Sequence, residues 1–294
     1  MIAVIGAPTS AGAFAPGQED APGALRAAGL VAALGASDRG DTPRFRWRVD
    51  SDAPRAMNAD AVVDGVRAVA ARVEKALRAG DLPLVLGGDC TVGIGTVAGA
   101  VAAGAEPRLV YLDLHPDLNT PDTVPDGALD WMGVAHMLDV EGADGRLAAA
   151  GPRRPLLGDD DLVLLGIGPD QCTAAERDAI AVRDLRPIGV DDLRADPVAA
   201  SHAALERAAD GGRRFLVHFD VDVIDFSDVP LSENTGRGIG VGFDAALAAV
   251  GVLAAHDALL GLTVTELNPH HGAQDGADVA RLAQALAGAL ARGW

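Results

Sequence analysis

The sequence predicts a single three-layer α/β/α domain with a mostly parallel sheet, and three observations lead to this fold class. Short apolar segments alternate with Ala-rich segments of helical length along all 294 residues. Such alternation is typical of βαβ units, in which helices cover both faces of a parallel sheet. The apolar segments are continuous, as expected of strands buried on both faces. No repeat or long linker divides the chain, so we expect one domain over residues 1–294.

The expected strands and helices follow from the apolar runs and from the residues that bound them. Strands are predicted at Ile2–Val4, Leu84–Leu86, Leu109–Leu112, Leu162–Leu165, Phe215–Phe219 and Gly261–Val264. Helices are predicted at Asn58–Ala79, Thr91–Ala103, Ala174–Ala181, Pro197–Ala209, Phe243–Ala255 and Gly276–Ala291. Asn58 is a suitable helix start and Gly80 a suitable stop, because Asn caps a first turn and Gly tolerates the backbone that follows a last turn.

Charge and composition limit the classes of partner. The formal net charge is -18 and the pI is near 4.6. Nucleic acids and anionic membranes favour basic surfaces, so we expect neither as a partner, whereas a cationic substrate is compatible with this charge. The first residues, MIAVIGAP, lack a basic segment followed by a long apolar run, and no run is long enough to cross a bilayer. We therefore expect a cytoplasmic protein.

Carboxylates and a histidine gather where two of the predicted strands end. DLHPD and DVD each follow an apolar run, which places Asp113, His115, Asp117, Asp220 and Asp222 at one edge of a parallel sheet. Alternate residues of an extended segment point the same way, so each motif can direct its side chains to one site. An unpaired buried carboxylate costs roughly several kcal/mol, and divalent cations would remove that cost. The pattern therefore predicts a site for two divalent ions.

A third motif, GGDC, follows the second predicted strand. Its two glycines permit a tight turn, Asp89 can cap the helix that follows, and Cys90 then lies at the same sheet edge as the acidic motifs. Cys90 is either a small buried hydrophobe or a thiolate ligand of the metal site. With only Cys172 besides it, the chain cannot form a disulfide framework.

The set GGDC, DLHPDLN, HFDVDVID and TELNP resembles the ureohydrolase family of arginases, agmatinases and formiminoglutamases. The resemblance covers nearly the whole chain, and it implies an arginase-like fold, a two-manganese centre and a homo-oligomer that is a trimer or hexamer. By motif position, it assigns one ion to Cys90, Asp113, Asp117 and Asp220. It assigns the other ion to Asp113, His115, Asp220 and Asp222, so that Asp113 and Asp220 bridge the two.

The resemblance also implies a small cationic guanidino compound as substrate. Two ions that share a water lower its pKa, and the hydroxide would attack the guanidinium carbon. Asp117 is placed to hydrogen-bond the hydroxide and to pass its proton to the leaving amine. Glu266 resembles the family's guanidinium-binding acid, because the two oxygens of a carboxylate suit a bidentate pair. Asn119 matches a position that helps to bind the amino-acid carboxylate in arginases.

Two substitutions distinguish this sequence from the family pattern. Cys90 stands where the family usually has His. Thiolate is a softer ligand than manganese prefers, so the first ion is expected to bind more weakly or to be a different metal. Asp130 replaces the usual active-site His, which removes a proton shuttle unless His136, His270 or His271 substitutes for it. Relatives with hydroxyarginine amidinohydrolase activity also diverge at the Cys90 position.

These observations favour an amidinohydrolase that converts L-arginine or N-hydroxy-L-arginine into urea or hydroxyurea and an amine. Agmatine, guanidino acids and formiminoglutamate stay open as substrates. Thiol catalysis by Cys90 and a non-catalytic, metal-binding regulatory relative are the alternatives from other classes. A dinucleotide site at the GxGxxA match of residues 93–98 is disfavoured, because the match lies inside a predicted helix and not directly after a strand.

Overall fold

The structure, a computed structural model that describes residues 1–291, contains a sheet of eight strands that all pair in parallel. The strand order is β2-β1-β3-β8-β7-β4-β5-β6. The strands are β1 (Ile2–Gly6), β2 (Ser37–Asp41), β3 (Leu82–Leu86), β4 (Arg108–Leu112), β5 (Leu162–Ile167), β6 (Ile188–Gly189), β7 (Phe215–Asp220) and β8 (Leu259–Thr265). All six predicted strands are present, and β2 and β6 extend the sheet at its two edges.

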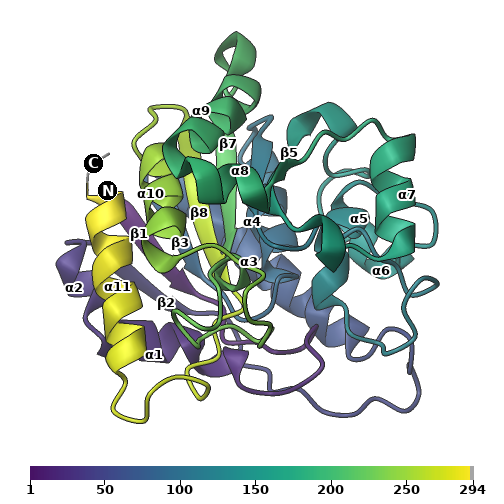
Figure 1. The fold of residues 1–294 in the computed structure, drawn as a ribbon. Coiled ribbons are helices and arrows are strands. Elements are labelled where there is room, and N and C mark those ends of the chain that lie inside the picture. The colour runs from purple at the N-terminus through teal and green to yellow at the C-terminus, as the bar shows by residue number, and fades with distance from the viewer. Residues whose placement is uncertain (292–294) are drawn as a thin grey trace.

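Helices connect the strands and form two layers (Figure 1). The longer helices are α3 (Ala59–Arg78), α4 (Val92–Ala102), α7 (Ala174–Val182), α9 (Pro197–Ala208), α10 (Phe243–Ala254) and α11 (Ala277–Leu290). The shorter ones are α1 (Ala21–Ala27), α2 (Leu30–Ala33), α5 (Gly133–Met137), α6 (Gly145–Ala148) and α8 (Val190–Ala195). The six predicted helices correspond to the six longer ones. Within residues 1–291, no helix is long and apolar enough to span a bilayer.

Alternate side chains of the central strands pack into cores on opposite faces of the sheet. Along β4, Val110 and Leu112 belong to one core, and Leu109 and Tyr111 belong to the other. The first core lies beneath α1, α2 and α8 to α11, and the second lies beneath α3 to α7. Burial on both faces explains why the strands are continuously apolar. The predicted three-layer α/β/α class is therefore confirmed.

Two glycines of α4 allow α3 to pack closely against it. A Cβ atom at Gly95 would lie 2.7 Å from the carbonyl oxygen of Val66, and a Cβ at Gly99 would lie 2.5 Å from that of Ala70. Both separations are shorter than real Cβ contacts, so only glycine fits. Part of the GxGxxA match thus serves helix packing, and the whole match, residues 93–98, lies inside α4.

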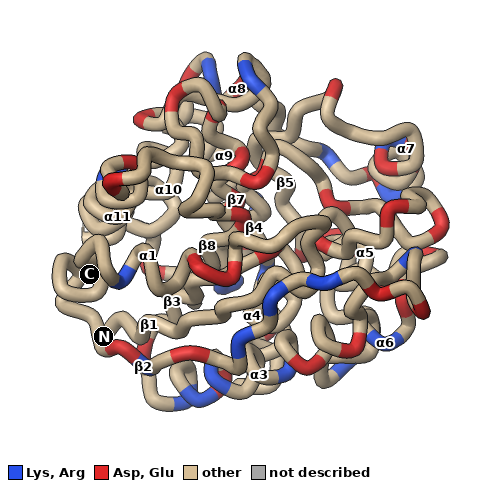
Figure 2. The backbone as a smooth tube through the Cα atoms, turned by 90° about the horizontal axis from the view of Figure 1, so that it is seen from below, with Lys and Arg blue, Asp and Glu red and all other residues tan. Residues whose placement is uncertain are grey.

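The carboxyl ends of the central strands bring the polar motifs together. Asp89 and Cys90 follow β3, Asp113 follows β4, Asp220 ends β7 and Glu266 follows β8. These four strands are neighbours in the sheet, in the order β3, β8, β7 and β4. Figure 2, which views the molecule from below, shows acidic residues beside β4, β7 and β8. The sheet therefore gathers acidic side chains from four separate segments at the carboxyl ends of its central strands.

Candidate metal centre

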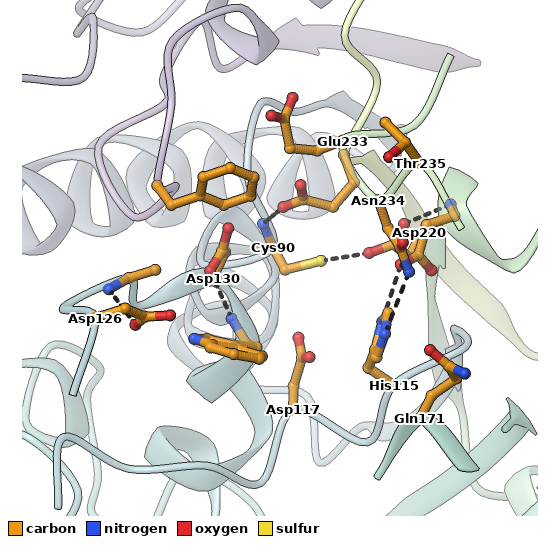
Figure 3. Close-up of a pocket in the computed structure, with 15 residues that line it drawn as sticks. Cys90, His115, Asp117, Asp126, Asp130, Gln171, Asp220, Glu233, Asn234 and Thr235 are labelled. Carbon is orange, nitrogen blue, oxygen red and sulfur yellow. Dashed lines mark hydrogen bonds and ion pairs between the residues drawn. The ribbon is translucent and has the colours of Figure 1, made fainter. Parts of the chain in front are cut away.

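A cavity of about 570 Å³ opens at the carboxyl ends of these central strands (Figure 3). Cys90, His115, Asp220 and Asp222 line one part of it, and Glu266 lies in the wall formed by the segment after β8. Figure 3 shows the Cys90 thiol directed towards Asp220, while Asp117 points into the same space from the segment after β4. The motifs that the sequence places at strand ends therefore meet in one cavity.

One group of potential metal ligands comprises Cys90, Asp113, His218 and Asp220, whose ligand atoms all lie within 4.8 Å of one another. The Cys90 Sγ lies 3.0 Å from Asp220 Oδ2 and 3.2 Å from His218 Nε2. Each of the four side chains is at most 3 % exposed. Burial lowers the pKa of His218 to about 3, so its imidazole is neutral, which is the form that binds a metal.

A second group comprises Asp113, His115 and Asp222. His115 Nδ1 lies 2.9 Å from Asp222 Oδ2 and 3.6 Å from Asp113 Oδ1. Asp113 belongs to both groups, so the two sets of ligands share one carboxylate. The Oδ2 of Asp113 and the Oδ1 of Asp222 are buried and have no hydrogen-bond partner. Buried carboxylate oxygens without partners are costly, and a bound cation would satisfy them.

The pKa values of the acids reflect their burial first and the repulsion between their charges second. Burial, together with the charge of Asp222, raises the pKa of Asp113 to about 7. Burial and the charges of Asp222 and Asp113 also raise the pKa of Asp220 well above its ordinary value. Such raised values arise when carboxylates share a site with too little positive charge. Here His115 supplies some, because it lowers the pKa of Asp222 against the effect of burial. Divalent ions would supply that charge, so the residues present fit a two-metal centre.

Asp117 faces the cavity but lies outside both ligand groups. The Tyr111 hydroxyl donates a hydrogen bond to its Oδ2. Burial, and then the charge of Asp113, raises the pKa of Asp117 well above its ordinary value. The backbone of Asp117 has a φ of 50°, in the left-handed region, which turns the chain at the end of the DLHPD motif. The assignment of Asp117 as a metal ligand stays a prediction, and its place in the cavity also suits proton transfer.

Glu266 occupies the wall between the first ligand group and the N-terminal loop. Its Oε1 accepts a hydrogen bond of 2.7 Å from the Cys90 backbone N–H, and its Oε2 accepts one from Gln18 Nε2. Burial, followed by the charge of Asp130, raises the pKa of Glu266 well above its ordinary value. Asp130 also lines the cavity, and its Oδ1 accepts a hydrogen bond of 3.0 Å from the Trp131 N–H. Burial raises the pKa of Asp130 as well.

The other predicted side chains lie away from the cavity wall. Asn119 is fully buried, and its Oδ1 accepts hydrogen bonds from Thr173 and Thr123 at 2.9 and 3.1 Å. His136 is also buried, with Nδ1 bonded to the Met132 carbonyl and Nε2 accepting from the Asp144 N–H. His270 pairs with Asp20, and His271 bonds to the Ser232 carbonyl. None of the three alternative histidines contacts the cavity among the described residues.

Two side chains of the site were not singled out from the sequence as ligands or as partners of ligands. Tyr111 holds Asp117, and Gln18 holds Glu266. Tyr111 precedes Asp113 by two residues, and side chains two residues apart in an extended segment point the same way. The position of Tyr111 beside the site could therefore have been inferred from the sequence. Gln18 lies in the loop before α1, and the sequence has no periodic signal for it.

Known proteins resemble the whole chain. A model of the Arginase family matches residues 1–291. A curated arginase from Agrobacterium fabrum is 29% identical over 279 residues, which cover 90% of this chain and 83% of that protein. The crystal structure of an arginase from Bacillus caldovelox aligns with a TM-score of 0.87 at 26% identity, covering 100% of this chain and 98% of that one.

A formimidoylglutamase structure from Bacillus subtilis shares the fold, with a TM-score of 0.76 at 22% identity over 99% of this chain and 86% of that one. The match of the family model extends across the strands, the acidic motifs and the cavity described above. On this evidence, the chain belongs to the Arginase family of hydrolases.

Proposed function

We propose that the enzyme hydrolyses a guanidino C–N bond of an arginine-like substrate, with L-arginine and N-hydroxy-L-arginine as the favoured substrates. The products are urea or hydroxyurea and an amine. The observation that carries this proposal is that Asp113 is shared by two ligand groups beside a cavity whose wall contains Glu266. Two adjacent divalent ions suit hydrolysis, because when bound they supply a water of lowered pKa as the nucleophile.

The side chains of the cavity account for the remaining requirements of the reaction. Glu266 binds the guanidinium group, since it lines the cavity and a carboxylate suits a bidentate pair with a guanidinium. Asp117 takes the proton of the attacking water and delivers it to the leaving nitrogen as the C–O bond forms and the C–N bond breaks. The Tyr111 hydroxyl orients Asp117 for this transfer.

The charge of the cavity supports a cationic substrate. Seven acidic side chains line it, namely Asp117, Asp126, Asp130, Asp220, Asp222, Glu233 and Glu266. Among the described residues no Lys or Arg does so. Because Asn119 is buried away from the cavity, the side chain expected to bind an amino-acid carboxylate does not reach it. This observation favours a second candidate, an amine substrate such as agmatine, which has no carboxylate.

The test is a release assay for urea and hydroxyurea, with and without added manganese. The substrates are L-arginine, N-hydroxy-L-arginine, agmatine, guanidino acids and formiminoglutamate, the last assayed by loss of its formimino group. Metal-dependent release from a guanidino compound supports the proposal, and the best substrate separates the two candidates. Metal binding without turnover of any of these compounds would contradict it and would favour a regulatory relative.

We also propose a manganese-type centre of two divalent ions whose first site is altered by Cys90, a cytoplasmic location and a trimeric or hexameric assembly. These proposals rest on family membership. Elemental analysis measures the metals, and light scattering coupled to size-exclusion chromatography measures the mass of the assembly. A monomeric mass at micromolar concentration would contradict the proposed assembly.

A further inference from the structure

The two ligand groups differ in their donor atoms. The first offers the Cys90 sulfur, the His218 imidazole and two carboxylates, whereas the second offers the His115 imidazole and two carboxylates. Thiolate is a soft ligand that suits zinc, and carboxylate oxygen suits manganese. The general order of affinity for divalent metals places manganese at the weak end and zinc near the strong end. The two halves of the centre therefore favour different ions.

His218 is held in the position of a ligand. Its Nε2 lies 3.2 Å from Cys90 Sγ and 3.0 Å from Thr265 Oγ1, and its ring stacks on Tyr111. A Cβ at residue 93 would lie 2.6 Å from His218 Nδ1, so Gly93 in α4 leaves room for the ring. These contacts fix the imidazole next to the thiol, with Nε2 on the side of the ligand group.

The first group supplies four ligand atoms without Asp117. Cys90, His218, Asp220 and the shared Asp113 provide one sulfur, one nitrogen and two oxygen atoms. Cys, His and Asp are all zinc ligands, and zinc in proteins typically takes four ligands. Asp117 is engaged by the Tyr111 hydroxyl instead. The imidazole of His218, which comes from β7, thus provides the nitrogen ligand that the substitution at position 90 removes.

We propose that this chain builds an asymmetric two-metal centre. In it, Cys90, His218, Asp220 and Asp113 bind a zinc-class ion, and Asp113, His115 and Asp222 bind manganese. The proposal rests on the binuclear hydrolase proposed above, but it concerns which metal each half selects and makes His218 a ligand. A zinc-class ion at the first group would contribute its positive charge to the shared centre, while Asp117 stays free to carry protons.

The experiment uses the metal-depleted protein under reducing conditions. One equivalent of Co²⁺ is added first, because a cobalt–thiolate bond gives a near-ultraviolet charge-transfer band. We expect this band in the wild type, its loss when one equivalent of Zn²⁺ is added, and its persistence when Mn²⁺ is added instead. We expect Cys90→Ser to abolish the band. Cys172→Ser is the matched control, because Cys172 is the other buried cysteine and lies outside both ligand groups.

His218→Gln tests the ligand that is specific to this proposal. We expect the Zn²⁺ dissociation constant to rise at least about ten-fold, since even the loss of an outer partner of a ligand costs that much. Manganese binding at the second group, followed by electron paramagnetic resonance, should persist. Zn²⁺ affinity equal to that of the wild type would overturn the role of His218, and two manganese ions that exclude zinc would overturn the asymmetry.

X-ray absorption on the wild type answers the same question if His218→Gln does not fold. With zinc at the first group and manganese at the second, the zinc edge should show one sulfur at about 2.3 Å and an imidazole nitrogen at about 2.0 Å. A zinc shell of oxygen alone would overturn the proposal. Binding of zinc and manganese without turnover would contradict only the proposed function. Full turnover with two manganese ions would contradict only the asymmetric centre.

Discussion

The phenol ring of Tyr111 lies flat against the imidazole of His218, with ring centroids 4.2 Å apart and 10° between the ring planes. The two residues face each other across neighbouring strands, because Tyr111 of β4 pairs in register with His218 of β7. The hydroxyl of the same tyrosine donates a hydrogen bond to Asp117. One side chain thus positions both a potential metal ligand and the acid assigned to proton transfer.

Tyr111→Phe separates these two roles, because it keeps the stacked ring and removes the hydrogen bond to Asp117. We expect kcat to fall by roughly 10- to 100-fold, since misplacement of a reacting group by about 1 Å costs that much. Metal content should stay that of the wild type, because the ring still supports His218. Steady-state kinetics and elemental analysis measure the two effects. Unchanged kcat would show that Tyr111 does not orient Asp117 for catalysis.

Asp220→Asn should abolish turnover and lower metal occupancy, because its carboxylate lies in the first ligand group and 3.0 Å from the Cys90 thiol. Removal of one negative charge also weakens attraction for a divalent ion. Asp178→Asn is the control, since Asp178 is an exposed acid on α7. Kinetic assays and elemental analysis of both variants test this prediction. Full activity of Asp220→Asn would exclude the two-metal centre.

Glu266→Gln should lower kcat/KM by roughly 10- to 100-fold, because a hydrogen bond to a charged group contributes about 1.5–3 kcal/mol. The loss should appear with guanidino substrates while metal content is unchanged. Glu233→Gln is the matched comparison, because Glu233 also lines the cavity but accepts a hydrogen bond of 2.9 Å from Asn268. We expect a smaller loss for Glu233→Gln. Equal losses would argue against a specific guanidinium contact at Glu266.

His136 should make stability depend on pH in the acid range. Burial lowers its pKa from the ordinary 6.5 to about 4 in the folded protein. Because the folded pKa is the lower one, the unfolded chain binds the proton first. The stabilisation is therefore complete above pH 6.5 and is lost as the pH falls towards 4. The slope is at most about 1.4 kcal/mol per pH unit for one proton.

Urea unfolding of the metal-depleted protein, measured from pH 7 to pH 4, tests this expectation. His136→Gln should be less stable at pH 7, because two buried hydrogen bonds change, and should lose less stability on acidification. His202→Gln, at an exposed position of α9, is the control. If His136→Gln keeps the full pH dependence of the free energy of unfolding seen in the wild type, that dependence arises from other groups.

Sequence patterns predicted the buried strands but not the edges of the sheet. The central strands are continuous apolar runs, which burial on both faces requires. In contrast, β2 reads SDRGD, is mostly exposed, and has no apolar residue, so only its pairing with β1 makes it a strand. β6 contains two residues, too few for any periodicity. The short helices α1, α2, α5, α6 and α8 were missed because fewer than two turns carry no clear helical period.

The site shows the same division between local pattern and tertiary packing. The acidic motifs at the ends of β4 and β7 were found because a strand end is a local feature. The sequence did not show that Gln18, from a loop, reaches Glu266 more than two hundred residues later. Nor did it show that Asn119 is turned into the protein by Thr173 and Thr123. These contacts depend on loop packing, for which single residues carry no signal.

The shared carboxylate of Asp113 has a thermodynamic consequence for metal loading. Since Asp113 belongs to both ligand groups, an ion at either group changes the charge and orientation that the other ion meets. By linkage, the factor by which the first ion changes the affinity for the second equals the factor in the reverse direction. Occupancy of each group therefore depends on the free concentration of both metals, and scarcity of one metal would alter how firmly the enzyme retains the other.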